Sequence, residues 1–410
     1  MEKTITKTRD NFETSSRPDR LSVRERLLAR WLKRIVFGRL TVDLPSGRRV
    51  VFQGDHEGPL ASIQVHDLNL IYRIAIAGDM GLAEGYMQGE WETPDLTTLL
   101  HLGAANATAF DISIEPNWFV NILNRLRHAC RANTKHGSRR NIAAHYDLGN
   151  DFYGKWLDET MSYSAALFED FSEGHAAAQR QKYVRLAESI DLKAGDRVLE
   201  IGCGWGGFAE IAAADYGCSV LCLTLSKEQA RYATQRMAGK GLSEQVEIRV
   251  QDYRDVDGQY DKIVSIEMFE AVGEAYWKTY LDILGHRLTP GGRAALQIIT
   301  ISDACFSNYR KSPDFIQRYI FPGGMLPSPA AFEAAVVRSN LRISESFYFG
   351  KSYAETLRRW DRMFQENWDE IAAQGFDRTF FRMWRYYLCY CEVGFDRDTI
   401  DVGHFVIEHS

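Results

Sequence analysis

A run of closely spaced glycines, Glu200-Ile-Gly-Cys-Gly-Trp-Gly-Gly207, is the segment of this sequence best suited to hold a ligand. Glycine carries no side chain that would collide with a bound molecule, and it adopts backbone conformations that other residues avoid. The run follows a short apolar segment, residues 197–201, which predicts a buried strand, and it precedes a helical pattern over residues 208–216. Because the first N–H groups of a helix are unpaired and favour a negative charge, this arrangement predicts a cofactor site.

The glycine spacing alone leaves two cofactors open. Gly202, Gly204 and Gly207 satisfy the GxGxxG pattern of dinucleotide sites. Such a site needs an acidic residue about 20 positions further on, at the ribose, whereas the next predicted strand ends in Leu223-Thr-Leu-Ser226. Glu200 directly before the loop is typical of S-adenosylmethionine (SAM) sites, which hold no pyrophosphate. We therefore predict SAM rather than NAD, with a purely structural glycine turn as the third interpretation.

Strand and helix patterns alternate along the chain from about residue 180, and these elements must position the loop. Four further strands are predicted over residues 219–224, 246–250, 260–266 and 293–299, and a helix over residues 227–240. Such alternation predicts an α/β fold with a doubly wound parallel sheet covered on both faces. The C-terminal third is rich in aromatic residues and is predicted to be largely helical.

The N-terminal part of the chain predicts a separate, smaller domain. Residues 1–20 are polar and charged and are expected to be disordered. Residues 21–125 combine short alternating stretches with a helical pattern near residues 68–86, which predicts a small α+β domain. A basic linker over residues 126–145 is expected to lead into the larger α/β domain, residues 146–410.

Residues 21–40 predict a basic amphipathic helix at the start of the smaller domain. Its apolar and basic residues fall on opposite sides, with Leu28, Trp31, Leu32 and Ile35 against Arg26, Arg30 and Lys33. Such a helix can lie on an anionic membrane surface, with Trp31 at the level of the headgroups. The alternative is a helix that packs on its own domain and exposes a solvated basic face.

The composition excludes several classes of protein. A chain of 410 residues with 45% hydrophobic and 25% charged residues is neither disordered nor fibrous, and its net charge of −6 does not favour nucleic acid. No uncharged apolar run approaches the roughly 18 residues of a membrane span. The seven cysteines contain no CxxC pair and no zinc spacing, which predicts reduced thiols and no metal site. We expect a soluble cytoplasmic protein, peripheral to the inner face of the membrane.

Several motifs together resemble those of the cyclopropane fatty acid synthases. They are His145-Tyr-Asp-Leu-Gly-Asn150, Met161-Ser-Tyr-Ser164, the glycine loop, Gln251-Asp-Tyr-Arg254, Met268-Phe-Glu-Ala-Val-Gly273, Tyr319-Ile-Phe-Pro-Gly-Gly324 and Tyr386-Tyr-Leu-Cys-Tyr-Cys391. The resemblance covers residues from about 130 to 410. It implies a class I SAM-dependent methyltransferase with a Rossmann-like sheet and helical lipid-binding insertions. Such enzymes act on unsaturated acyl chains of membrane phospholipids and are often homodimers.

The resemblance also implies which residues contact the cofactor. They are Tyr163 and Ser164 beside the methionine moiety, Glu200, Gly202, Cys203, Gly204, Trp205 and Gly206 in the glycine loop, Thr224, Ser226 and Gln229 near the ribose, and Asp252, Tyr253 and Arg254 beside the adenine. Considered without the family, Thr224 and Ser226 could cap the next helix, and Tyr253 could be ordinary core.

The family's reaction places strict demands on its site. A cis alkene attacks the sulfonium methyl group, and the acyl chain is left with a positive charge. Water must be excluded, and aromatic faces stabilise such a cation. The C-terminal region supplies many aromatic residues, most of which are expected to be structural. Tyr319 and Tyr353 are the preferred exceptions, because both lie in family motifs.

A base must then take a proton from the added methyl group, and family members hold a bicarbonate ion for this. Glu270 and Tyr353 match two of its ligands, whereas Gln297 and Ala165 replace a histidine and a cysteine. Gln297 can still donate a hydrogen bond to an anion, while the side chain of Ala165 offers nothing polar. Glu270 is therefore expected to hold the bicarbonate or to act as the base itself. Cys391 aligns with the family's reactive thiol and is expected near the pocket.

These residues predict SAM-dependent formation of cyclopropane fatty acids, with two alternatives. Members of the branch with this Glu-Ala-Val-Gly sequence and a glutamine also make methylene- or methyl-branched chains, and methylation of a diene would lead to a furan. The sequence does not decide among these products, because the position of the base is not visible in it. The second alternative is a non-catalytic protein that binds SAM and recruits a partner through its N-terminal domain, because three polar groups around the base are replaced, at Ala165, Gln297 and Ala271.

Overall fold

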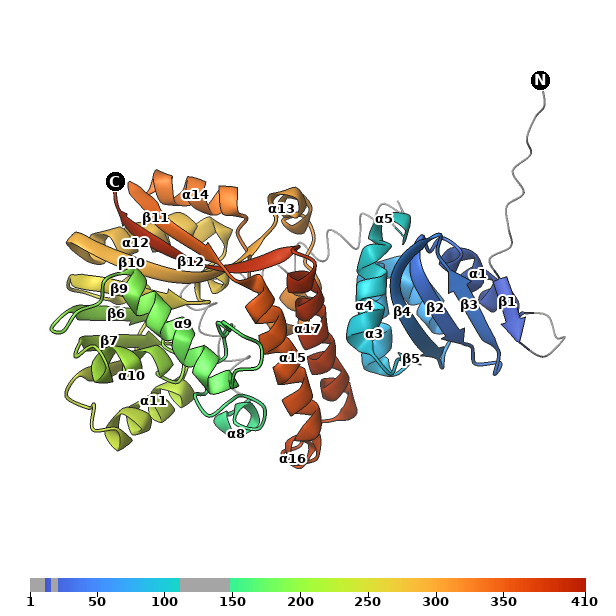
Figure 1. Cartoon of the computed structure of the whole chain (residues 1–410), viewed down its shortest axis with the longest axis horizontal. Coiled ribbons are helices and arrows are strands. Elements are labelled where there is room, and N and C mark those ends of the chain that lie inside the picture. Colours follow the sequence, from blue (N-terminus) through green and yellow to red (C-terminus); the bar gives the residue numbers. More distant parts are fainter. Residues whose placement is uncertain (1–11, 16–20, 111–147) are drawn as a thin grey trace, which may run out of the picture. The chain divides into compact units, whose positions relative to one another are not determined.

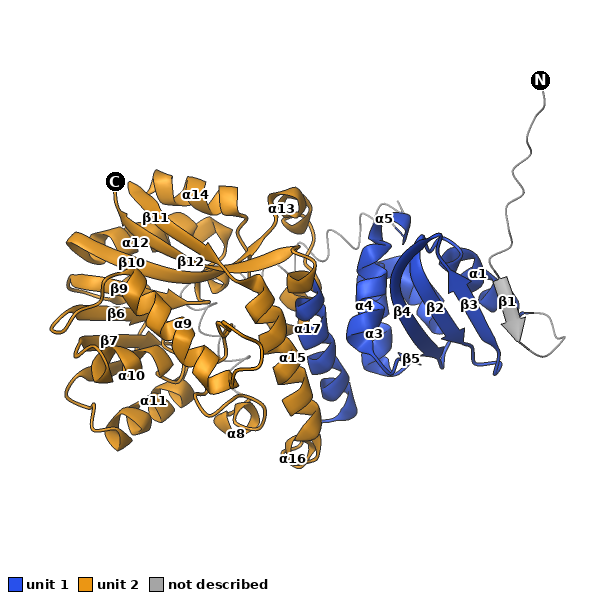
Figure 2. Ribbon diagram, viewed as in Figure 1, with its two compact units in different colours: residues 1–121, 377–393 blue, residues 122–376, 394–410 orange. Residues whose placement is uncertain are grey.

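The computed structural model describes residues 12–15, 21–110 and 148–410 (Figure 1). The predicted basic linker, residues 126–145, and the start of the motif at His145 lie outside the described residues. The chain divides into two compact units (Figure 2). Unit 1 consists of residues 1–121 and 377–393, and unit 2 of residues 122–376 and 394–410.

Unit 1 is built on a five-stranded mixed sheet with the strand order β1-β3-β2-β4-β5. The strands are β1 (Phe12–Ser15), β2 (Phe37–Asp43), β3 (Arg49–Gln53), β4 (His56–Val65) and β5 (Trp91–Glu92). The helices are α1 (Val23–Leu32), α2 (Asn69–Ala77), α3 (Asp79–Gln88), α4 (Leu96–Ala105), α5 (Ala107–Phe110) and most of α17 (Arg378–Asp396). Strand β1 lies in the segment expected to be disordered, and α17 in the segment expected to belong wholly to the larger domain.

Helix α1 begins at a capping box, in which the Ser22 hydroxyl accepts a hydrogen bond from the N–H of Glu25 and the Glu25 carboxylate accepts one from the N–H of Ser22. The predicted apolar stripe packs into its own unit, since Leu28 and Leu32 are buried. Trp31 packs against Phe110 with 4.6 Å between ring centroids, so it is not a free anchor for lipid headgroups. The packing alternative is therefore correct for the stripe, while the basic residues of the helix stay exposed.

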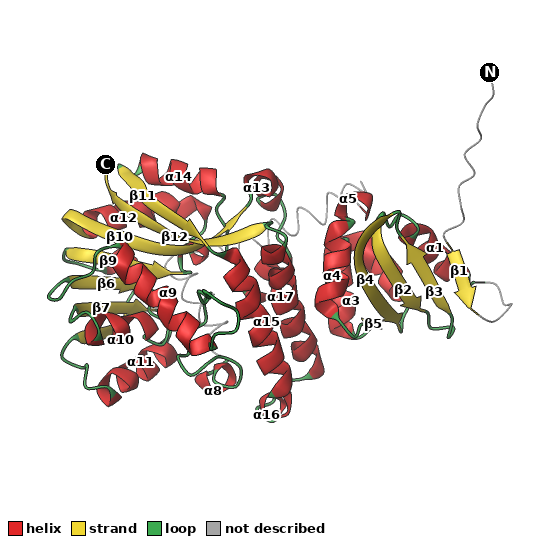
Figure 3. Ribbon diagram, viewed as in Figure 1, coloured by secondary structure: helices red, strands yellow, loops and turns green. Residues whose placement is uncertain are grey.

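Unit 2 contains a seven-stranded sheet with the order β11-β12-β10-β9-β6-β7-β8 (Figure 3). The strands are β6 (Arg197–Ile201), β7 (Ser219–Thr224), β8 (Val246–Val250), β9 (Tyr260–Ile266), β10 (Leu288–Ile301), β11 (Leu341–Tyr348) and β12 (Ile400–His409). Strands β6 to β10 are parallel, whereas β12 pairs antiparallel with β10 and β11. The predicted doubly wound α/β fold is confirmed, and the antiparallel strands β11 and β12 are an addition to it.

Helices cover both faces of this sheet, as the alternating pattern requires. The helices are α8 (Asn150–Tyr153), α9 (His175–Ser189), α10 (Gly207–Ala214), α11 (Lys227–Gly239), α12 (Trp277–Arg287), α13 (Asp303–Tyr309), α14 (Pro329–Arg338), α15 (Gly350–Glu366) and α16 (Trp368–Ala372). One core cluster joins the sheet to α9, α10 and α11, and the other joins it to α12 and α14 (Figure 1). Strand β6 is buried at four of its five positions, as expected for a central parallel strand.

The parallel strands bring three functional segments to one edge of the sheet. The glycine loop follows β6, Ser226 follows β7, and Glu267 follows β9. Because β6 pairs with both β7 and β9, these segments are neighbours in space. In the part of the chain that the structure describes, no helix is long and apolar enough to cross a membrane, and no cluster of acidic, His or Cys side chains could hold a metal ion.

Candidate active site

The glycine loop between β6 and α10 has the geometry of a cofactor site. Gly202, Gly204 and Gly206 have φ values of +82°, +53° and +86°, which residues with side chains rarely adopt. The N–H groups of Gly202 and Cys203 donate to the carbonyl of Leu223 at 2.9 and 3.0 Å, which fixes the loop on β7. A Cβ atom on Gly204 would meet no atom within 4 Å, so the backbone there faces free space that a ligand can fill.

Glu200 is a buried residue of β6, two positions before Gly202. It is 2% exposed. Its carboxyl accepts a hydrogen bond from the N–H of Ala209, and its Oε2 atom lies 3.5 Å from the Cys222 sulfur. Burial raises the pKa of Glu200 to about 8. We infer that Glu200 supports the loop and the first turn of α10 from within the sheet.

The two residues expected beside the methionine moiety lie in a buried polar and aromatic setting. The Ser164 hydroxyl accepts a hydrogen bond from the Lys182 ammonium at 2.7 Å, and the Ser164 carbonyl accepts one from Gln179 at 2.9 Å. Lys182 is buried, which lowers its pKa to about 7. The ring of Tyr163 packs against Tyr153. Their partners hold both residues in place, so this part of the site is preformed.

The residues expected at the ribose cluster at the carboxyl end of β7. Thr224 donates to the Gln229 side chain at 2.9 Å and accepts from the N–H of Ser226 at 3.1 Å. The Ser226 hydroxyl accepts from the N–H of Gln229 at 3.2 Å and so caps α11. The capping role considered for this segment therefore applies to Ser226, and the three side chains form one buried group.

The residues expected at the adenine surround a short helix, η1 (Tyr253–Asp255). Asp252 accepts two hydrogen bonds from the Arg254 guanidinium at 2.8 and 2.7 Å, and its side chain is fully buried in this pair. Tyr253 is partly buried and packs edge-on against Tyr280, with 5.2 Å between the centroids. The Arg254 guanidinium, held by Asp252, lies over the Tyr253 ring at 5.3 Å from its centroid.

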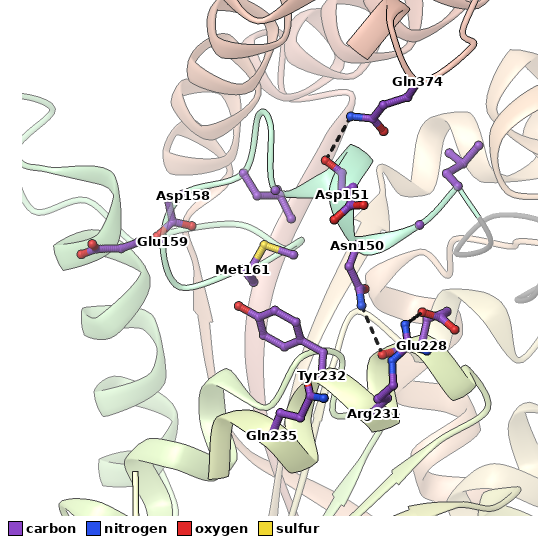
Figure 4. Close-up of a pocket in the computed structure, with 14 residues that line it drawn as sticks. Asn150, Asp151, Asp158, Glu159, Met161, Glu228, Arg231, Tyr232, Gln235 and Gln374 are labelled. Atoms are coloured by element: carbon purple, nitrogen blue, oxygen red, sulfur yellow. Dashed lines mark hydrogen bonds and ion pairs between the residues drawn. The ribbon is translucent and has the colours of Figure 1, made fainter. Parts of the chain in front are cut away.

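A cavity of about 750 Å³ lies between α8 and α11 (Figure 4). Asn150 connects its wall to the glycine loop, because the Asn150 side-chain Oδ1 atom accepts from the Trp205 indole N–H at 2.7 Å. The lining is polar and carries four carboxylates and one guanidinium: Asp151, Asp158, Glu159, Glu228 and Arg231. None of the residues predicted to contact the cofactor lines this cavity, so it adjoins the predicted site without containing it.

Glu267 is the centre of the site's hydrogen-bond network, and sequence analysis did not select it. Its Oε2 atom accepts from the Tyr353 hydroxyl at 2.7 Å. Its Oε1 atom accepts from the Gln297 amide at 2.7 Å and from the N–H of Ala165 at 2.8 Å. These three donors belong to residues that the resemblance aligns with ligands of bicarbonate, and all three donate to one carboxylate of the chain. We call this group the carboxylate cradle.

Two features of Glu267 mark it as unusual. Its φ of +50° is left-handed, which is costly for a residue other than glycine and is typical of functional sites. Burial raises its pKa, while Tyr353, Ala165, Lys182 and Gln297 act against that rise. The signal in the sequence was its position, because an acidic residue directly after a parallel strand lies at the ligand-binding edge of the sheet.

Glu270, which sequence analysis placed beside Tyr353 and Gln297, has different partners. Its Oε1 atom accepts from the N–H of Ile299 at 2.5 Å, and its Oε2 atom is buried without a hydrogen-bond partner. Burial, followed by the charge of Glu267, raises the pKa of Glu270 to about 8. A pKa near 8 favours the protonated form of Glu270 at pH 7, and the Tyr353 hydroxyl donates to Glu267.

An aromatic wall connects the carboxylate cradle to the glycine loop. Successive ring centroids lie 5.1 to 6.2 Å apart from Tyr353 through Trp360, Tyr163 and Tyr153 to Trp205. Tyr319 lies in the short helix η4 (Ile316–Ile320) and is partly buried, and its ring packs against Phe315 with 5.3 Å between centroids. Cys391 belongs to unit 1 and is not among the residues gathered in unit 2.

Replacing Glu270 with Gln should increase stability at neutral pH. As the pH rises from about 4.5 to about 8, an unfolded chain releases this proton and the folded chain retains it, so the wild-type protein loses stability across that window. The Gln variant cannot ionise and should gain about 1–3 kcal/mol relative to wild type, as measured by urea unfolding at pH 5 and pH 8. Glu274→Gln, at a surface ion pair with Arg310, should show no such gain. Parallel pH curves for wild type and Glu270→Gln would contradict this assignment.

Comparison with known proteins places the site in a family context. Residues 133–405 match the sequence profile described as mycolic acid cyclopropane synthetase. The chain is 42% identical over 346 residues to a tuberculostearic acid methyltransferase of Mycobacterium tuberculosis, covering 82% of this chain and 81% of that protein. It is 36% identical to the cyclopropane-fatty-acyl-phospholipid synthase of Escherichia coli, covering 85% and 88%.

Solved structures agree with these sequence matches. A mycolic acid cyclopropane synthase, CmaA1, in complex with SAH and CTAB superposes with a TM-score of 0.62 at 29% identity, over 66% of this chain and 97% of that one. A coclaurine N-methyltransferase bound to SAH gives the same TM-score at 18% identity, which supports the fold alone.

Proposed function

Because the chain belongs to the mycolic acid cyclopropane synthetase family, we propose that Glu267 is the base in its methylation of lipid double bonds. Family membership makes the chain an enzyme, a SAM-dependent methyltransferase that modifies lipid acyl chains, rather than a non-catalytic SAM-binding protein. The cofactor is S-adenosylmethionine.

The residues around the glycine loop fit this cofactor. Backbone at Gly204 faces free space, and the family resemblance assigns Ser164 to the methionine portion and Thr224 to the ribose portion. When bound, the cofactor supplies an activated methyl group on a positively charged sulfur. The aromatic wall excludes water and offers ring faces to a cation on the acyl chain, each worth about 0.5–2 kcal/mol.

In the proposed reaction the alkene is the nucleophile and Glu267 is the base. The π electrons of the alkene form a bond to the methyl carbon, the bond from that carbon to sulfur breaks, and the neighbouring chain carbon becomes a cation. Glu267 then takes a proton from the transferred methyl group, and the C–H electron pair closes a cyclopropane ring. The single observation that carries this proposal is that the cradle of Tyr353, Gln297 and Ala165 holds the Glu267 carboxylate itself.

Glu267→Gln should lower the turnover number about 100-fold or more, because an amide cannot accept the proton. SAH binding, measured by calorimetry, should stay within about twofold of wild type, and Glu333→Gln on the exposed face of α14 should behave like wild type. Turnover is measured as transfer of label from SAM to unsaturated phospholipid vesicles. Substantial turnover by Glu267→Gln would remove this residue from the role of base.

Glu267→Gly should create an enzyme that depends on an added anion. Glycine tolerates the φ of +50° at this position, and the three donors of the cradle are then left without their carboxylate. Bicarbonate or formate should restore at least a tenth of wild-type turnover, whereas wild type should be unaffected by removal of bicarbonate from the buffer. A wild-type enzyme that stops without bicarbonate would contradict a built-in base.

Two products are compatible with this reaction. A cyclopropane is the first candidate, in line with the Escherichia coli relative. A methylene- or methyl-branched chain is the second, in line with the tuberculostearic acid methyltransferase. In the cyclopropane and methylene routes the proton can leave from the transferred methyl group, and the methylene product requires that a hydride migrate to the cationic carbon first. A saturated methyl branch would form only if a separate hydride donor then reduced the methylene group.

Mass spectrometry of the reacted acyl chains separates the two products. Both have the same added mass of one CH₂ if the branched chain keeps a methylene, so the chains are cleaved at alkenes by ozone before analysis. A cyclopropane should survive ozone, and a methylene chain should be cleaved at the methylated carbon. We expect a chain that resists ozone as the major product, and a chain cleaved at that carbon would establish the second candidate instead.

We further propose that unit 1 brings the enzyme to an anionic phospholipid surface. Helix α1 exposes Arg26, Arg30 and Lys33 together with Leu27, which is 54% exposed. Ile76 on α2 is 69% exposed, so unit 1 combines basic groups with solvent-facing apolar side chains. That combination suits a membrane interface, where Lys and Arg near the surface contribute about 1 kcal/mol each.

Replacing Arg26, Arg30 and Lys33 together with Gln should weaken flotation with anionic vesicles by about 10- to 100-fold. The effect should shrink as salt is raised, because salt screens exposed charges. A control with the same loss of charge in unit 2, at Lys311, Arg338 and Arg362, should float like wild type. Equal flotation of the two triple variants would show that the basic face of α1 does not bind the membrane.

A further inference from the structure

A buried histidine, His404, contacts Gln297 of the carboxylate cradle, and the proposed reaction does not use it. His404 on β12 pairs directly with Gln297 on β10 in the antiparallel register, so the two side chains share one face of the sheet. Its Nε2 atom lies 3.0 Å from the Gln297 Oε1 atom, and its Nδ1 atom is buried without a partner. His404 is 2% exposed and Gln297 is 1% exposed, so neither side chain exchanges partners with water.

We propose that His404 is a positioning residue that orients the Gln297 amide so that its NH₂ group faces the Glu267 carboxylate. The inference rests on the proposed role of Glu267 as the base. It adds a residue that acts on that base without touching it, since His404 reaches the carboxylate only through the glutamine. The three side chains come from neighbouring positions in the sheet: His404 on β12, Gln297 on β10 and Glu267 directly after β9.

The two ends of the Gln297 amide differ in hydrogen bonding, because the oxygen accepts and the NH₂ group donates. A glutamine side chain has nearly the same shape when its oxygen and nitrogen are exchanged, so packing alone does not choose between them. With the observed orientation, Nε2 of Gln297 donates to Glu267 at 2.7 Å while Oε1 accepts from the N–H of His404. The exchanged orientation would set the amide oxygen against a carboxylate. Its NH₂ group would also meet the ring proton on Nε2 unless that proton moved to Nδ1, where it would be buried without a partner.

The protonation state of His404 makes it a fixed donor. Burial, helped by the positive charges of Lys182 and Arg185, holds the pKa of His404 well below its usual value, so the ring is neutral near pH 7. Because the Gln297 oxygen only accepts, the single ring proton must lie on Nε2. Phe349 packs edge-on against the ring with 4.8 Å between centroids and keeps it in this orientation.

The other groups that face Glu267 come from separate elements and do not orient the amide. Tyr353 approaches from α15, Lys182 from α9 and Glu270 from the short helix η2 (Phe269–Ala271). Of the described residues, Gln297 and Ala165 complete the hydrogen bonds of the carboxylate. Loss of the Gln297 donor should therefore raise the pKa of Glu267, because one bond to its charged form disappears.

The test compares His404→Leu, which removes the donor, with His404→Gln, whose NH₂ group can replace it. In the full-length enzyme with unsaturated phospholipid vesicles, His404→Leu should lower kcat about 10-fold with an unchanged KM for SAM. The acid limb of its kcat profile should move to higher pH, by roughly half a unit or more. His404→Gln should recover most of the rate and the wild-type profile, and His409→Leu, at an exposed position of the same strand, should resemble wild type.

Two further measurements keep the outcomes distinguishable. If His404→Leu has the wild-type pH profile, or if His404→Gln is as impaired as His404→Leu, the positioning role is overturned and His404 only fills space. If Glu267→Gln retains turnover, the proposed base fails, whatever the His404 variants do. Should His404→Leu not fold, NMR of the wild-type protein with ¹⁵N-labelled histidine decides. A neutral ring with its proton on Nε2 supports the inference, and any other state near pH 7 overturns it.

Discussion

A carboxylate held among aromatic rings is the constraint on which the rest of this site depends. The base must be charged to accept a proton, yet the reaction requires a cavity without water, and burial disfavours the charged form. Burial raises the pKa of Glu267, the proposed base, while three hydrogen-bond donors and the nearby Lys182 act against that rise. The left-handed backbone at Glu267 is a cost of reaching these donors.

The same constraint explains why two neighbouring carboxyls behave differently. Glu267 has a full set of donors, whereas Glu270 has one backbone donor and an oxygen without a partner. Like charges in one low-dielectric site cannot both be maintained, so the group with fewer donors keeps its proton. Glu270 thus lowers the local charge near Glu267, and its neutrality is part of the electrostatic balance of the cradle.

Sequence patterns predicted the elements of unit 2 well, because buried parallel strands and the glycine loop are encoded by neighbouring residues. Strands β6, β7, β8 and β9 have the predicted bounds. The pairing inside the site was not predictable in this way. Glu267 and Glu270 are three residues apart, and which of them meets Tyr353, 86 residues later, depends on the left-handed turn after β9. Sequence analysis likewise gave Ala165 no role, because its side chain is not polar, although its backbone N–H donates to Glu267.

The anchoring of the base bears on how a single site can give different products. Glu267 sits at the end of β9, and its donors lie on β10, on α15 and in the loop at Ala165, so the base is tied to four parts of the unit. A base held in this way cannot follow a proton that moves along the acyl chain. The position of the double bond, which the aromatic wall determines, therefore decides between ring closure and hydride migration. Residues of that wall, rather than those of the cradle, should govern which product forms.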